Sequence, residues 1–110
     1  MREALRRMLT AAGYEARAYE SAEAFLGACA ASDLRCLVAD IRLPGISGLD
    51  LQRRLVEEGH AHPVIFITAH DTVEARREAD ALDAVAFLIK PFEGRLLMSA
   101  VATALAQATN

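Results

Sequence analysis

Apolar residues follow two patterns along the chain, short unbroken runs and a helical period. Unbroken runs over 36–39, 64–67 and 85–89 predict strands that are buried on both faces, as in a parallel sheet. A weaker alternation over 14–19 predicts one more strand. Because these strands alternate with segments of helical period, the pattern indicates an α/β domain with a parallel sheet.

Five segments have the helical period, at about 2–12, 21–29, 49–59, 72–82 and 94–105. Gly13 supplies a stop for the first segment, and Ser21 can cap the second. Asp71 or Thr72 can cap the fourth. The apolar stripe of this fourth helix is thin, so we expect the helix to be loosely held: Val73, Ala79 and Leu82.

Composition excludes several classes of protein. The chain has 110 residues, 54% of them apolar, and a net charge of −3, which fits one ordered domain over 1–110. No apolar run reaches the ~20 residues needed to cross a bilayer, and no secretion signal follows Met1. Mild acidity predicts no direct nucleic-acid binding, because phosphate contacts need a basic face. Cys29 and Cys36 are too few for a disulfide framework, so we expect both to be reduced and buried in a cytoplasmic protein.

Three polar side chains follow the three apolar runs: Asp40, Thr68 and Lys90. Because the carboxyl ends of parallel strands share one edge, where ligands bind, we expect these side chains to converge. A carboxylate can attack phosphorus while a hydroxyl and an ammonium bind the phosphoryl oxygens, so the set predicts a phosphoryl-accepting site. Lys90 is the one lysine among twelve basic residues. Each residue taken singly has a simpler structural interpretation, and the prediction depends on their combination.

The loops around these residues resemble a known family. The segments 37–48 (LVADIRLPGISG), 67–70 (ITAH) and 87–92 (FLIKPF) are similar to receiver domains of bacterial two-component systems, and the match runs from Arg2 to the C-terminus. Together with 49–55 (LDLQRRL), they are most similar to FixJ-like receivers. The resemblance implies a CheY-like, doubly wound flavodoxin-type sheet that takes phosphate from a sensor histidine kinase. FixJ-like receivers commonly precede a LuxR-type helix-turn-helix, which implies such an output domain or partner.

The resemblance also assigns roles to individual residues. It makes Asp40 the phosphoacceptor and places the backbone carbonyl of Arg42 beside Mg²⁺. Thr68 would be the hydroxyl that moves toward the phosphoryl group, and Lys90 the cation that pairs with it, with a cis peptide bond after it. Phe87 corresponds to the switch aromatic, which turns inward when Thr68 moves. The fourth helix, the last strand and the last helix would form the signalling surface.

The chain departs from the family at its start. Receivers open with an apolar strand that ends in two adjacent acidic residues, whereas the first acid here, Glu3, lies within the first predicted helix. We therefore expect an N-terminally truncated receiver with four strands. Its Mg²⁺ site would be incomplete, with Asp40 and the Arg42 carbonyl as ligands and weak or absent binding. The missing strand predicts that its neighbours close up, that two copies pair as a homodimer, or that the natural protein starts upstream.

Other functions fit parts of the sequence. Without the acidic pair, the chain can be a phosphorylation-deficient pseudo-receiver that acts through protein–protein contacts. A haloacid-dehalogenase-like phosphatase also places aspartate, threonine and lysine at strand ends, but it needs a second aspartate where this chain has Arg42. We expect no enzyme activity beyond the domain's own phosphorylation and dephosphorylation. His60 and His62 fit a solvated loop better than a metal site.

Overall fold

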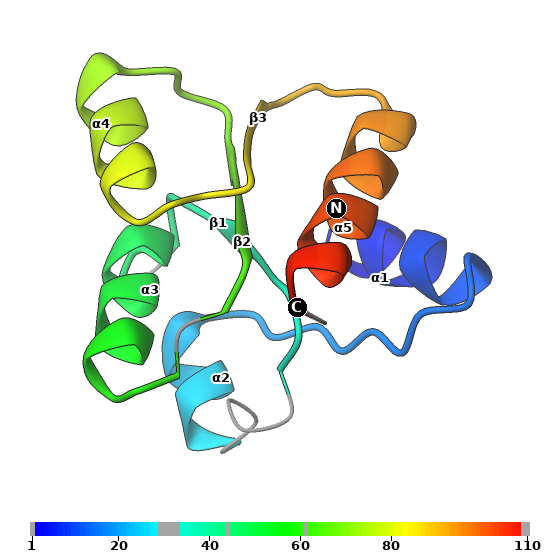
Figure 1. The fold of residues 1–110 in the computed structure, drawn as a ribbon, viewed down its shortest axis with the longest axis horizontal. Coiled ribbons are helices and arrows are strands. Elements are labelled where there is room, and N and C mark those ends of the chain that lie inside the picture. Colours follow the sequence, from blue (N-terminus) through cyan, green and yellow to red (C-terminus); the bar gives the residue numbers. More distant parts are fainter. Residues whose placement is uncertain (1, 29–33, 44, 61, 109–110) are drawn as a thin grey trace.

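A computed structural model gives the structure of the chain and describes residues 2–28, 34–43, 45–60 and 62–108. Helices and strands follow in the order α1 (Arg2–Ala11), α2 (Ala22–Gly27), β1 (Leu37–Asp40), α3 (Gly48–Glu57), β2 (Val64–Thr68), α4 (Val73–Ala81), β3 (Ala86–Ile89) and α5 (Gly94–Ala108). The strands form one parallel sheet in the order β1-β2-β3 (Figure 1). The predicted α/β class, the strands from the three apolar runs and the helices are therefore confirmed.

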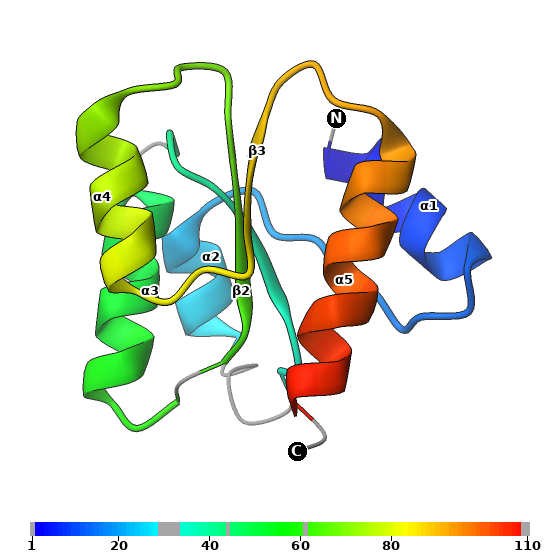
Figure 2. The ribbon, with the colours of Figure 1, turned by 45° about the horizontal axis from the view of Figure 1, so that its top comes forward.

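Helices cover both faces of this sheet. α3 and α4 lie on one side of it and α5 on the other, with α1 beside α5 (Figures 1 and 2). The strand side chains divide accordingly, because Phe66 packs with Leu55 of α3 whereas Ile65 packs with Leu97 of α5. All five residues of β2 are buried. An unbroken apolar run is what a strand covered on both faces requires.

Side-chain caps begin several helices where the sequence predicts them. Ser21 accepts a hydrogen bond from the backbone N–H three residues on at 3.0 Å, and Thr72 does the same at 3.1 Å. Thr72 rather than Asp71 is thus the cap of α4. α4 rests on the sheet through the thin stripe expected of it: Ala79 is buried, but Val73 is 60% exposed. Its attachment depends on few apolar contacts.

Residues 14–19 form no strand, so the prediction of four strands is wrong: the described residues contain three. Alternation shows which side chains face solvent, but a strand also needs a neighbour to bond its backbone. Leu37 and Ile41 donate their N–H groups toward β2, to the carbonyls of Pro63 and Ile67. No described strand pairs with the opposite edge of β1. The neighbours have therefore not closed up, and 14–19 is an irregular connection from α1 to α2 (Figure 2).

The sequence also raises expectations for the cysteines, the Lys90–Pro91 peptide bond and the length of the helices. Cys36 is a free, half-buried thiol, and burial raises its pKa to about 11, which keeps it neutral and unreactive; Cys29 lies outside the described residues. The peptide bond between Lys90 and Pro91 is cis, as the resemblance implies. None of the described helices is long and apolar enough to cross a membrane.

Candidate functional site

Asp40, Thr68 and Lys90 stand at one edge of the sheet. Asp40 is the last residue of β1, Thr68 is the last of β2, and Lys90 directly follows β3. In the parallel register Asp40 lies beside Ile67, and the Lys90 N–H donates to the Thr68 carbonyl at 2.8 Å. The backbone thus brings the three predicted residues to the carboxyl edge, where open parallel sheets bind ligands.

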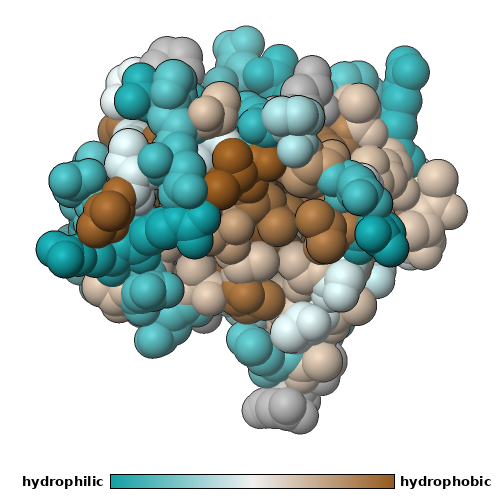
Figure 3. All heavy atoms as spheres, turned by 90° about the horizontal axis from the view of Figure 1, so that it is seen from above, coloured by the Kyte–Doolittle hydropathy of each residue, from teal (hydrophilic) through white to brown (hydrophobic). Residues whose placement is uncertain are grey.

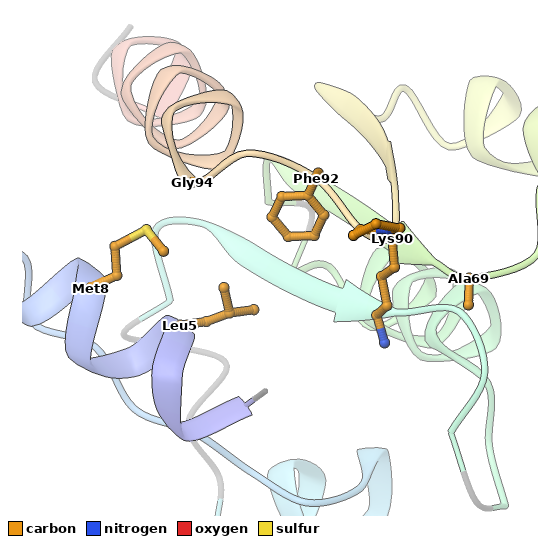
Figure 4. Close-up of a pocket in the computed structure, with 7 residues that line it drawn as sticks. Leu5, Met8, Ala69, Lys90, Phe92 and Gly94 are labelled. Atoms are coloured by element: carbon orange, nitrogen blue, oxygen red, sulfur yellow. The ribbon is translucent and has the colours of Figure 1, made fainter.

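The Asp40 carboxylate has a hydrogen-bond donor at each oxygen. Lys90 Nζ forms an ion pair with Oδ2, and the Arg42 backbone N–H donates to Oδ1 at 3.0 Å. The Asp40 and Lys90 side chains are only 26% and 25% exposed. Solvent therefore screens this pair less than it screens a surface pair. Figure 4 shows Lys90 extending from β3 toward the end of β1.

The loop between β1 and α3 folds tightly back over Asp40. Gly48 donates its N–H to the Ile41 carbonyl at 3.2 Å, and a Cβ at Gly48 would lie 2.4 Å from the Asp40 carbonyl oxygen. Only glycine permits this approach. Between Ile41 and Gly48, the Ile46 N–H donates to the Glu23 carboxylate of α2 at 3.3 Å. The loop that carries Arg42 is thus held at its base and near its tip.

Thr68 does not bond to the Asp40–Lys90 pair. Its side chain is 1% exposed, and its hydroxyl accepts the His70 N–H at 3.0 Å and donates to the His70 carbonyl at 3.2 Å. The hydroxyl is therefore satisfied within its own loop. Moving it toward Asp40 requires breaking both of these hydrogen bonds.

Phe87 lies on β3, on the side of the sheet that α3 and α4 cover. It is half-buried and lies beside Phe66 in the parallel register, and both belong to the same apolar cluster. The guanidinium carbon of Arg76, on α4, lies 4.9 Å from the centroid of its ring. Arg76 in turn binds Asp71, with one N–H···O contact at 3.0 Å. Sequence reasoning missed this contact because it joins a helix to a strand.

An apolar pocket of about 540 Å³ opens beside Lys90, lined by Leu5, Met8, Ala69, Lys90, Pro91, Phe92 and Gly94. Leu5 and Met8 reach across from α1 toward Phe92 (Figure 4). Seen from above the fold, apolar atoms gather in the middle of this face between hydrophilic margins (Figure 3). Leu5 and Met8 are half-buried and three residues apart on α1, but no sequence pattern indicates that they face Lys90.

The described residues offer a poor site for a metal ion. No group of three histidine, cysteine, aspartate or glutamate side chains among them is placed to hold one. At the sheet edge, the candidate oxygens are those of Asp40 and the Arg42 carbonyl, and Lys90 already pairs with Asp40. Mg²⁺ keeps several waters in its octahedral shell and is usually held by one or two carboxylates. This set supplies one carboxylate, whose charge Lys90 already neutralises.

The family is decided by comparison with known proteins. A family profile described as the response regulator receiver domain matches residues 1–102. The chain belongs to this family. It is a receiver domain of the two-component type, with the CheY-like fold predicted from its loops.

Two curated relatives are similar to this chain along nearly its whole length. The transcriptional regulatory protein FixJ of Bradyrhizobium diazoefficiens is 36% identical over 108 residues, which are 98% of this chain and 53% of FixJ. The response regulator protein TmoT of Ectopseudomonas mendocina is 38% identical over 94% of this chain and 47% of its own length. The chain therefore spans about half the length of these curated relatives.

Solved structures agree with this assignment. The crystal structure of FixJ-N has a TM-score of 0.83 and 39% identity, and the match covers 96% of this chain and 84% of that one. The predicted similarity to FixJ-like receivers is thus confirmed. Family membership also favours a receiver over the phosphatase considered from the sequence.

Proposed function

We propose that Asp40 accepts a phosphoryl group from a sensor histidine kinase and that the domain signals through α4, β3 and α5. The observation that carries this proposal is the partly buried Asp40–Lys90 pair at the carboxyl edge of the sheet, with the Arg42 N–H on the other carboxylate oxygen. The pair joins a nucleophile to a cation at the place where this fold binds ligands.

The residues divide the chemistry among them. A carboxylate oxygen of Asp40 attacks phosphorus, the P–N bond of phosphohistidine breaks, and its electron pair stays on the imidazole of the kinase. The Lys90 ammonium then moves from the carboxylate to the phosphoryl oxygens, whose negative charge it neutralises. Thr68 donates its hydroxyl to the same group once it leaves the His70 backbone. Phe87 fills the space that this movement opens.

Receiver domains typically hold Mg²⁺ at the phosphorylation site. Asp40 and the Arg42 carbonyl would be its ligands here, and they fit the ion poorly because the single carboxylate is already paired with Lys90. No step above therefore depends on it. We expect phosphorylation to be slow and weakly stimulated by Mg²⁺.

Mass spectrometry after treatment with acetyl phosphate tests the proposal. We expect the chain to gain the mass of one phosphoryl group, Asp40→Asn to gain nothing, and Asp50→Asn, on the exposed surface of α3, to label like the wild type. Lys90→Ala should slow labelling. Labelling that survives in Asp40→Asn would contradict the proposal.

A pseudo-receiver is the second candidate, favoured by the single carboxylate that the described residues bring to this edge. In that case neither acetyl phosphate nor a kinase would label Asp40, although the chain folds and binds its partner. The greater length of relatives such as transcriptional regulatory protein FixJ, and that name, support a LuxR-type helix-turn-helix output domain or partner. We further propose that the receiver works in the cytoplasm.

A further inference from the structure

A continuous set of contacts leads from Thr68 to Phe87 through the loop before α4. The Thr68 hydroxyl makes both of its hydrogen bonds to the His70 backbone. The next residue, Asp71, holds the guanidinium of Arg76 through two N–H···O contacts. Arg76 reaches across to the ring of Phe87, 4.9 Å from its centroid. The proposed switch hydroxyl and the proposed switch aromatic are therefore joined by one short segment and one ion pair.

The sheet places both ends of this set on one face. Phe66 and Thr68 are two residues apart on β2, so their side chains share a face, and Phe66 is the register partner of Phe87. The Phe87 ring packs against the apolar cluster beneath α3 and α4, and Arg76 approaches it from α4. Arg76 is thus placed to resist movement of the ring.

The ion pair orients Arg76 before it meets the ring. The hydrogen bond between the two side chains lowers the pKa of Asp71 and raises the pKa of Arg76, so both stay charged near neutral pH. Both side chains are about half exposed, 43% for Asp71 and 50% for Arg76. Exposed ion pairs and cation–π contacts are individually weak. Such contacts can bias a switch without preventing it from moving.

We propose that Arg76, held by Asp71, is a positioning residue that keeps Phe87 in its half-buried position until Thr68 leaves the His70 backbone. The proposal rests on the proposed function, because it concerns how phosphorylation of Asp40 is read. When the Thr68 hydroxyl moves, the segment that carries Asp71 loses two hydrogen bonds. Arg76 then loses its orienting partner, and the ring is released. Removing Arg76 should therefore favour the switched position even without phosphate.

The test compares Arg76→Gln with Arg77→Gln, its neighbour on α4, which removes the same charge from an exposed residue that makes no ion pair with any described residue. Relaxation dispersion of the Phe87 ring carbons measures the minor position in the unphosphorylated protein. We expect Arg76→Gln to raise its population about two- to fivefold, the range that corresponds to one exposed cation–π contact. Arg76→Lys, which keeps the cation, should restore part of the wild-type behaviour, and Asp71→Asn should shift it in the same direction as Arg76→Gln.

Labelling by acetyl phosphate gives a second measurement. Arg76→Gln should label faster than the wild type, a gain that damage to the fold cannot produce. Equal ring populations in Arg76→Gln and Arg77→Gln would overturn the proposal, whatever the labelling. A different outcome is that the population of the minor Phe87 ring position rises in Arg76→Gln alone while acetyl phosphate never labels Asp40. That result would support the positioning role of Arg76 and overturn the proposal that Asp40 is the phosphoacceptor.

Discussion

The loops that follow β1 and β2 leave the same edge of the sheet, but they are held in different ways. The first folds back through backbone contacts: Gly48 packs against the Asp40 carbonyl, and the Gly48 N–H donates to the Ile41 carbonyl. The second, residues 69–72, is exposed, and its side chains lead to the exposed pair of Asp71 and Arg76. Rigid backbone contacts suit the placing of a nucleophile, whereas exposed polar contacts open at little cost. The domain thus separates chemistry from switching by the way each loop is attached.

The largest effect should come from Gly48→Ala, which tests the rigid loop. A methyl group there would lie 2.4 Å from the Asp40 carbonyl oxygen and 3.2 Å from the Ala39 Cβ. Alanine normally gains up to about 1 kcal/mol over glycine within a helix. Overpacking against backbone costs about 1–3 kcal/mol or more, so the net change should be destabilising. Urea unfolding measures it.

Gly27→Ala is the matched control, because nothing lies within 4 Å of a Cβ at the end of α2. We expect it to be neutral or slightly stabilising. If the two variants unfold at the same urea concentration, the close approach over Asp40 does not constrain the loop.

Most of this architecture follows from local sequence patterns. The runs at 36–39 and 64–67 predict β1 and β2 because burial on both faces leaves no room for polar residues. The strand predicted at 14–19 is not formed, because alternation of apolar and polar residues describes exposure and cannot supply a neighbouring strand. Strand ends share an edge in any parallel sheet, so the meeting of Asp40 and Lys90 was predictable.

The remaining contacts of the site depend on three-dimensional placement. The orientation of the Thr68 hydroxyl follows from its rotamer, and its nearest partner is the His70 backbone rather than Asp40. Arg76 meets Phe87, and Leu5 reaches the pocket beside Lys90, only because a helix and the sheet pack together. Such pairs are far apart along the chain and leave no periodic signal.

Each of the loops after β1 and β2 ends in a side chain that caps the next helix, and removing either cap should have an effect of intermediate size. Ser47 Oγ caps α3 and Thr72 Oγ1 caps α4, each accepting a backbone N–H at 3.1 Å. Replacing either by alanine should cost about 1 kcal/mol of helix stability. In Ser47→Ala we expect the loss in global unfolding, because α3 buries Leu51 and Leu55. In Thr72→Ala we expect it mainly as faster amide exchange within α4. Equal global losses would mean that α4 unfolds together with the core.

Glu23→Ala should have a smaller and more local effect. It removes the acceptor of the Ile46 N–H, a hydrogen bond of 3.3 Å on the exposed surface. We expect a loss below about 1 kcal/mol in global stability, with a clear loss of amide protection at Ile46. Glu23→Gln should keep most of the protection, since the amide oxygen can accept the same bond. Glu20→Ala removes an exposed acid three residues earlier in the chain and should leave the protection of the Ile46 amide unchanged. An equal effect would mean that the loss of negative charge alone is responsible.

Acidification is the mildest test. The hydrogen bond from Arg76 lowers the pKa of Asp71 below its usual value of 3.8. A carboxyl with a depressed folded pKa stabilises the fold above its unfolded pKa and loses that contribution as pH falls through the folded value. Protection factors of the α4 amides should therefore begin to decrease below about pH 4. The amides of the loop after β1, whose Gly48 contact is backbone packing, should keep theirs. Asp71→Asn should start from lower α4 protection and respond less to pH. An unchanged pH response in that variant would show that other carboxylates, such as Glu78 paired with Arg53, control the attachment of α4.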